Sequence, residues 1–255
     1  MREGQDEGIE IRHRAAVLGQ QWGNVATVET AGPQRRKFAH ADLQLHEISI
    51  ANPHLREVFI DSNALIPYDL THGVQLARPA PPTLATLVTS QFLHASVLHI
   101  FFNMLFLVVF GPEIEYLLGH VRFVLFYLAC GIAGNVAQVA VMTASHVPSI
   151  GASGAIAGVL GAYLLRFPTN AVETIVPIGC FPLFLRLPAY AVIGLWAAIQ
   201  FVHGFGSLSG RVLSEQGGGT AYFAHIGGFL AGVFLIALVP ARGPVAQGRR
   251  YRYYY

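Results

Sequence analysis

Three long stretches of this chain carry no charged side chain. Residues 123–165 form one of them, and residues 187–210 and 216–241 form the other two. Uncharged apolar stretches of about 18 or more residues are typical of transmembrane helices. Only 12% of the 255 residues are charged, which is about half the share found in a soluble domain. The sequence therefore predicts an all-α membrane protein that crosses the bilayer several times.

The distribution of charge divides the chain into three parts. Residues 1–90 hold 10 of the 14 acidic side chains. We expect a polar N-terminal segment at 1–80, whose fold the sequence leaves open, a transmembrane domain at 81–241, and a basic and aromatic tail at 242–255. Within the domain the apolar pattern predicts five spans. They cover roughly residues 97–118, 121–144, 150–165, 187–206 and 221–239.

The positions of the arginines predict the orientation of the spans. If the spans alternate in direction, the arginines that follow the first span, follow the third and precede the fourth share one face with those of the tail. Short connections rich in arginine stay on the cytoplasmic side. We therefore expect a multi-pass protein of a bacterial inner membrane. The arginines concerned are Arg122, Arg166, Arg186, Arg242, Arg249, Arg250 and Arg252.

Composition argues against several functional classes. A formal net charge of +2, without a basic patch, predicts no nucleic-acid partner. Cys130 and Cys180 lie in or near apolar segments, so we expect small core residues and no disulfide framework. A His-Glu-x-x-His motif and a pair of intramembrane aspartates, which metallo- and aspartyl proteases would need, are both missing. We expect no metal and no cofactor.

Four polar side chains stand out inside the predicted spans. His99 and Asn103 lie in the first two turns of the first span, Ser153 at the start of the third, and His225 at the start of the fifth. Polar groups are costly in lipid and mark functional sites. Because two crossings separate successive starts, all four are expected in one layer, just below the outer membrane face.

Ser153 and His225 form a candidate nucleophile and general base. A serine hydroxyl becomes reactive when a neighbouring imidazole takes its proton. An orienting carboxylate usually completes such a site, but no aspartate follows Asp69. We therefore expect a Ser–His dyad, with Glu215 of an outer loop still open as a third member.

His99 and Asn103 are spaced i, i+4, so they project from one helix face. Both can donate hydrogen bonds and, together with the Ser153 N–H, would stabilise an oxyanion. His94, just before the first span, is expected to support the outer rim of the site. Each residue taken alone has a plain structural interpretation, but their joint occurrence favours catalysis.

Small residues recur every three or four positions in the third span and every four positions in the fifth. Such residues let two membrane helices approach backbone to backbone. We therefore expect close contact between the helix of Ser153 and the helix of His225. The residues concerned are Gly154, Gly158 and Gly161 in the third span and Ala224, Gly228 and Gly232 in the fifth.

Four motifs between about residues 80 and 240 resemble the rhomboid intramembrane serine proteases. They read FLHASVLHIFFNMLFL, FGPEIEYLLGH, GASGAIAG and AHIGGFLAG. The resemblance implies that Ser153 is the nucleophile, that His225 is the base, and that His99 and Asn103 line the oxyanion hole, with Gly151 just before the serine. It also implies cleavage of the transmembrane segments of other membrane proteins near their outer ends, without a cofactor.

Two features depart from that family's pattern. Rhomboids have a six-span core, yet residues 1–80 contain no stretch for the first span. The most apolar piece, EVFIDSNALIPY, is short and contains Asp61. We therefore expect five recognisable spans and an N-terminus that is truncated, misread or divergent. In addition, some rhomboids place a tyrosine one turn after the serine, where this chain has Ala157.

Two functional hypotheses follow. The first is an intramembrane serine endopeptidase that works with a Ser–His dyad. The second is a catalytically impaired rhomboid-like scaffold, which binds membrane helices without cleaving them. In both cases the expected partners are transmembrane proteins and the lipid bilayer.

Overall fold

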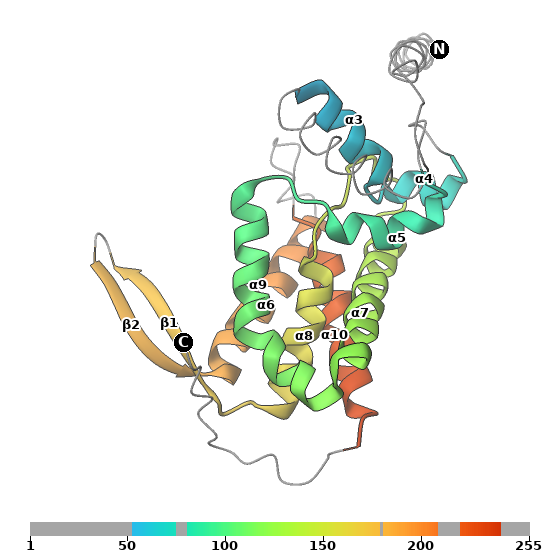
Figure 1. Ribbon diagram of the computed structural model, residues 1–255. Coiled ribbons are helices and arrows are strands. Elements are labelled where there is room, and N and C mark those ends of the chain that lie inside the picture. Colours follow the sequence, from blue (N-terminus) through green and yellow to red (C-terminus); the bar gives the residue numbers. More distant parts are fainter. Residues whose placement is uncertain (1–52, 75–80, 179–180, 209–219, 241–255) are drawn as a thin grey trace, which may run out of the picture.

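The computed structural model describes residues 53–74, 81–178, 181–208 and 220–240, and it contains a bundle of helices capped at one end (Figure 1). Five helices coincide with the five predicted spans. Three of them, α6, α7 and α9, are long and apolar enough to cross a membrane, whereas α8 and α10 have 14 and 16 residues. The expected helical membrane fold is confirmed. The bounds are α6 (Val97–Leu118), α7 (His120–Val141), α8 (Ser153–Arg166), α9 (Ala189–Leu208) and α10 (Tyr222–Ala237).

Short helices, which together form the cap, cover the end of the bundle at which α6, α8 and α10 begin (Figure 1). They are α3 (Pro53–Asn63), α4 (Pro67–His72), the 3₁₀ helices η1 (Thr83–Ala85) and η2 (Ser90–Phe92), and α5 (Thr86–Thr89).

The cap is joined to the chain just before α8 by backbone hydrogen bonds. Leu65 is fully buried, and its N–H and C=O pair with those of Ser149 at 3.1 and 2.8 Å. Part of the predicted polar segment thus packs on the transmembrane helices. The expected departure at the N-terminus falls largely on residues 1–52, which lie outside the described residues. The predicted tail at 242–255 also lies outside them.

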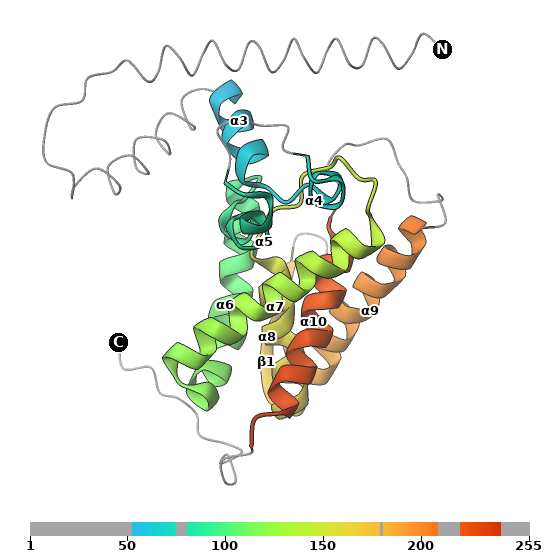
Figure 2. The ribbon, with the colours of Figure 1, turned by 90° about the vertical axis from the view of Figure 1, so that its right-hand side faces the viewer.

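Helix α8 lies at the centre of the bundle, in contact with α6, α7, α9 and α10 (Figure 2). Ala155, Ala157, Val159 and Ala162 of this helix are completely buried. Its glycines and alanines leave room for neighbouring backbones. The central position of α8 therefore follows from its small side chains.

The outer sides of the longer helices carry exposed apolar side chains. Within the most apolar part of α6, α7 and α9, only 22%, 33% and 17% of residues are buried inside the protein. Val97 at the start of α6 is 84% exposed, and Val202 of α9 is 70% exposed. Contact of such large apolar surfaces with water is unfavourable, so they are suited to contact with lipid.

A β-hairpin between α8 and α9 is an addition to the helical fold that the sequence led us to expect. Strands β1 (Ala171–Ile178) and β2 (Phe181–Pro188) pair antiparallel, with Glu173 opposite Arg186. The segment is rich in β-branched and aromatic residues and contains prolines that disfavour a helix. The hairpin leaves the bundle at the end opposite the cap (Figure 1). Cys180 lies outside the described residues, whereas Cys130 is a free, buried core residue, as expected.

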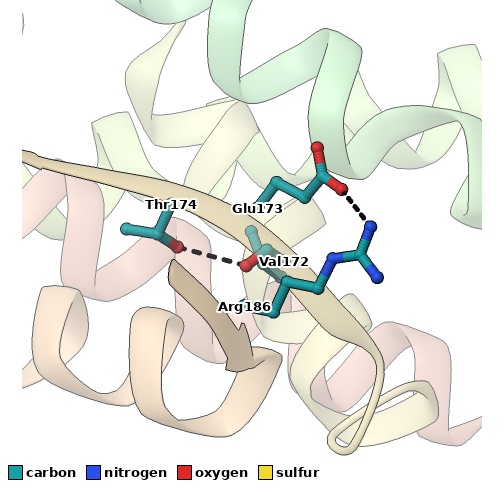
Figure 3. A network of polar contacts seen from close by, with 4 residues as sticks. All are labelled: Val172, Glu173, Thr174 and Arg186. Atoms are coloured by element: carbon teal, nitrogen blue, oxygen red, sulfur yellow. Dashed lines mark hydrogen bonds and ion pairs between the residues drawn. The ribbon is translucent and has the colours of Figure 1, made fainter. Parts of the chain in front are cut away.

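The ion pair of this hairpin is expected to contribute little to stability. Arg186 Nη2 lies 2.8 Å from Glu173 Oε1, and Thr174 bonds the Val172 carbonyl beside it (Figure 3). The two charged side chains are 70% and 79% exposed, and exposed pairs are worth at most about 1 kcal/mol. We expect Glu173→Gln to leave the thermal midpoint in detergent nearly unchanged. A loss of folding would contradict this expectation.

Candidate active site

The first turns of α6, α8 and α10 meet beneath the cap and surround one cavity of about 430 Å³. The four polar side chains that the sequence singled out all line it: His99 and Asn103 from α6, Ser153 from α8 and His225 from α10. The remaining walls are mostly apolar. They include Phe102, Phe106, Ile156, Leu160 and Trp196.

Ser153 and His225 are in direct contact. His225 Nε2 lies 2.7 Å from Ser153 Oγ, and only 8% of His225 is exposed. Small residues next to the pair bring the two helices together: a Cβ added to Gly154 would lie 3.3 Å from the Ala224 carbonyl oxygen, and one added to Gly228 would overlap the Gly154 carbonyl. The contact between hydroxyl and imidazole therefore depends on glycine packing within one helical turn of each residue.

The second ring nitrogen of His225 is bound by a residue that the sequence analysis did not select. Gln200 of α9, only 8% exposed, places its Oε1 atom 2.8 Å from His225 Nδ1. A carboxylate is the usual third member of such a site, so an amide was not among the predicted candidates. Gln200 is a polar residue inside an uncharged apolar span, as Asn103 is, so the criterion that selected Asn103 also applies to Gln200. Glu215, the carboxylate left open, lies outside the described residues.

An aromatic side chain from α9 lies beside His225. The rings of Trp196 and His225 have their centroids 5.9 Å apart. Ala157, at the position where some rhomboids have a tyrosine, is completely buried. The aromatic neighbour of the histidine is thus supplied by α9 and not by the helix of the serine.

The cavity that Ser153 lines also contains hydrogen-bond donors from α6 and from the start of α8. Asn103 is 7% exposed, and its Nδ2 atom is buried without a hydrogen-bond partner among the described residues. Ser153 is the first residue of α8, where backbone N–H groups lack an intrahelical acceptor. Since an unpaired buried donor is costly, this side of the cavity is suited to an anionic oxygen atom.

Gly151 leaves room for the His99 ring next to the backbone just before Ser153. Its φ angle is +125°, a value that favours glycine, and a Cβ there would lie only 2.8 Å from His99 Cε1. The Gly151 N–H donates to the Ser90 carbonyl at 2.9 Å, which ties this turn to the cap. A side chain at this position would displace the His99 ring.

His94 lies outside the spans, between the cap and α6. Its ring and that of His99 meet edge to face, with centroids 5.1 Å apart. Burial, and then the proximity of His99, lower the pKa of His94 below its usual value. His94 does not line the cavity, and its contact with His99 suits the supporting role expected for it.

The site thus combines a serine hydroxyl bonded to an imidazole, a group that holds the imidazole, and donors next to the serine. A nucleophile with an adjacent base performs acyl transfer when donors stabilise the oxyanion that forms. Apolar walls keep water scarce and strengthen these polar interactions. The arrangement is suited to attack on a carbonyl group in an apolar segment.

Comparison with known proteins gives a consistent result. The model of the rhomboid domain family matches residues 81–242. The chain is 34% identical over 164 residues, 64% of its length, to rhomboid protease GluP of Bacillus subtilis, and 32% identical over 149 residues, 58% of its length, to RHOMBOID-like protein 5 of Arabidopsis thaliana. It is 30% identical over 163 residues, 63% of its length, to the mitochondrial presenilin-associated rhomboid-like protein of Rattus norvegicus. The matched parts span 28%, 42% and 40% of these relatives.

Proposed function

Because this chain belongs to the rhomboid family, we propose that it is an intramembrane serine endopeptidase in which Ser153 is the nucleophile and His225 the general base. The observation that carries the proposal is the 2.7 Å contact between Ser153 Oγ and His225 Nε2. The donors beside the serine and the names of the protease relatives support it. We further propose that residues 81–241 form the catalytic domain.

The reaction follows from this geometry. His225 Nε2 takes the proton of Ser153 Oγ, which attacks the carbonyl carbon of a peptide bond. Asn103 Nδ2, His99 and the Ser153 N–H donate to the oxyanion. The His225 imidazolium then protonates the leaving amine, and the peptide C–N bond breaks. Water, deprotonated by His225, finally releases the acyl group from Ser153.

The proposed substrates are transmembrane segments of other membrane proteins. The cavity opens among the first turns of helices, so a substrate segment would be cut near its end, where its backbone can unwind. The distribution of arginines supports a position of the site near the outer face of a bacterial inner membrane. No metal or cofactor enters this mechanism.

A serine-directed probe on the purified full chain in detergent tests the proposal. A fluorophosphonate should label the wild type, and Ser153→Ala should abolish labelling, because only an activated serine reacts with the probe. Labelling that Ser153→Ala leaves unchanged would overturn the proposal. A chain that captures membrane helices but never labels would instead be the non-cleaving scaffold.

Asn103 is expected to contribute to turnover and not to stability. Its Nδ2 atom has no hydrogen-bond partner among the described residues, so Asn103→Leu should leave the thermal midpoint unchanged or higher. Loss of one oxyanion donor should lower kcat about 10²- to 10³-fold. Cleavage kinetics and thermal unfolding of the same preparations measure the two effects.

Asn135 of α7 is the matched control for Asn103. It is equally buried, but its Nδ2 atom donates to the Leu87 carbonyl at 2.8 Å and to Ser90 Oγ at 3.0 Å. Asn135→Leu removes both of these hydrogen bonds and should cost about 1–3 kcal/mol of stability. If both variants lost stability equally, Asn103 would be a structural residue.

A further inference from the structure

One face of α9 contacts His225 through two side chains, one turn apart. Trp196 places its ring near the imidazole, and Gln200 bonds to His225 Nδ1 at 2.8 Å. The Gln200 Nε2 group donates to the Trp196 backbone carbonyl at 3.3 Å. This second hydrogen bond turns the amide so that its oxygen, and not its nitrogen, faces the histidine.

The orientation of this amide determines which ring nitrogen of His225 carries the proton. A carbonyl oxygen only accepts hydrogen bonds, so Nδ1 must be the donor. In a neutral imidazole, Nε2 then has a free lone pair. That lone pair points at Ser153 Oγ, 2.7 Å away, and is the one that takes the serine proton.

We infer that Gln200 is a positioning residue for catalysis: its amide oxygen holds His225 in the tautomer and ring orientation that activate Ser153. It does what a carboxylate does in a Ser-His-Asp site, but without a charge. The catalytic part of this inference rests on the proposed function.

A neutral acceptor suits this position in the fold. Gln200 is 92% buried, in a stretch of 24 residues without any charged side chain. A carboxylate there would lose its hydration and carry a large desolvation cost. An amide orients the ring at a much smaller cost, because both of its polar atoms are paired within α9 and with His225.

Substitution of Gln200 by methionine tests the inference, because methionine has a similar length and no strong acceptor. In the full chain in detergent, Gln200→Met should lower kcat for a transmembrane substrate about 10- to 100-fold, by analogy with the partners that orient metal-bound histidines. KM should stay within about twofold, since no substrate contact is lost. Gln200→Glu keeps an acceptor oxygen and should retain more of the wild-type kcat.

Gln138 of α7 provides the matched control. Its Oε1 atom accepts from the Ala224 N–H at 3.3 Å, so it also binds the start of α10, but through the backbone. Gln138→Met should leave kcat close to that of the wild type. If it lowered kcat as much as Gln200→Met, placement of α10 would explain the effect and the inference would be overturned.

A spectroscopic measurement separates this inference from the proposed protease function. In ¹⁵N-histidine-labelled protein carrying Ser153→Ala, the His225 signals, identified by their loss in His225→Asn, should show Nδ1 protonated and Nε2 unprotonated. Adding Gln200→Met should introduce the other tautomer. An unchanged spectrum would overturn the inference even in an active enzyme. A chain that cleaves nothing but shows the shift would refute the protease function alone.

Discussion

Ser153→Ala and His225→Asn are each expected to lower kcat for a transmembrane substrate by at least about 10³-fold, and the double variant should be no worse than the single ones. The two residues act as a unit, because the hydroxyl is reactive only when the imidazole takes its proton, and losses within such a unit do not add. Substrate cleavage in proteoliposomes, with kcat and KM measured separately, checks the prediction.

The same helix that holds Gln200 supplies matched controls for both substitutions. Ser207 Oγ donates to the Gly204 carbonyl, three residues earlier in α9, and the His203 ring stacks on Tyr222. Ser207→Ala and His203→Asn should therefore cleave at the wild-type rate. Losses that multiply in the double variant, or an active His225→Asn variant, would contradict a shared chemical step.

Gly232→Ala is expected to be among the most destabilising single changes in the chain. A Cβ at this position would overlap the Gly158 carbonyl, so α8 and α10 would have to separate. Forced overpacking of a core costs about 1–3 kcal/mol and sometimes more. Thermal unfolding in detergent measures the loss, and labelling of Ser153 should fall with it, because the same helix contact aligns Ser153 with His225.

Two other glycines give this prediction a graded control. A Cβ at Gly194 of α9 would meet nothing within 4 Å, so Gly194→Ala should be neutral or gain up to about 1 kcal/mol from better helix propensity. A Cβ at Gly154 would lie 3.3 Å from the Ala224 carbonyl oxygen, so Gly154→Ala should have an intermediate effect. Equal stability of the Gly232 and Gly194 variants would show that α8 and α10 are not held in backbone contact.

Much of the helical architecture could be predicted before any coordinates. Hydropathy and the spacing of charges placed all five spans to within a few residues, and the rhomboid resemblance is confirmed by the family match. His99, Asn103, Ser153 and His225 were selected because polar groups are rare in lipid. Their common layer followed from the alternation of spans, which counts crossings and needs no packing detail.

The contacts that complete the site depend on residues far apart in the chain. Gln200 and His225 are 25 positions apart, and nothing local to either shows that their side chains meet. A carboxylate is also the usual third member of such a site, so a neutral amide does not stand out as a candidate. Trp196 likewise lies near the histidine only because α9 packs beside α10.

The sequence by itself determined which segments enter the membrane and which polar groups go with them, because solvation in lipid depends on the composition of each segment alone. The tertiary structure decided the remaining features: the partner of His225 Nδ1, the packing of His99 on Gly151, the β-hairpin and the docking of Leu65 beside Ser149. Each of these is a contact between separate segments, and its energy exists only once packing has brought both sides together.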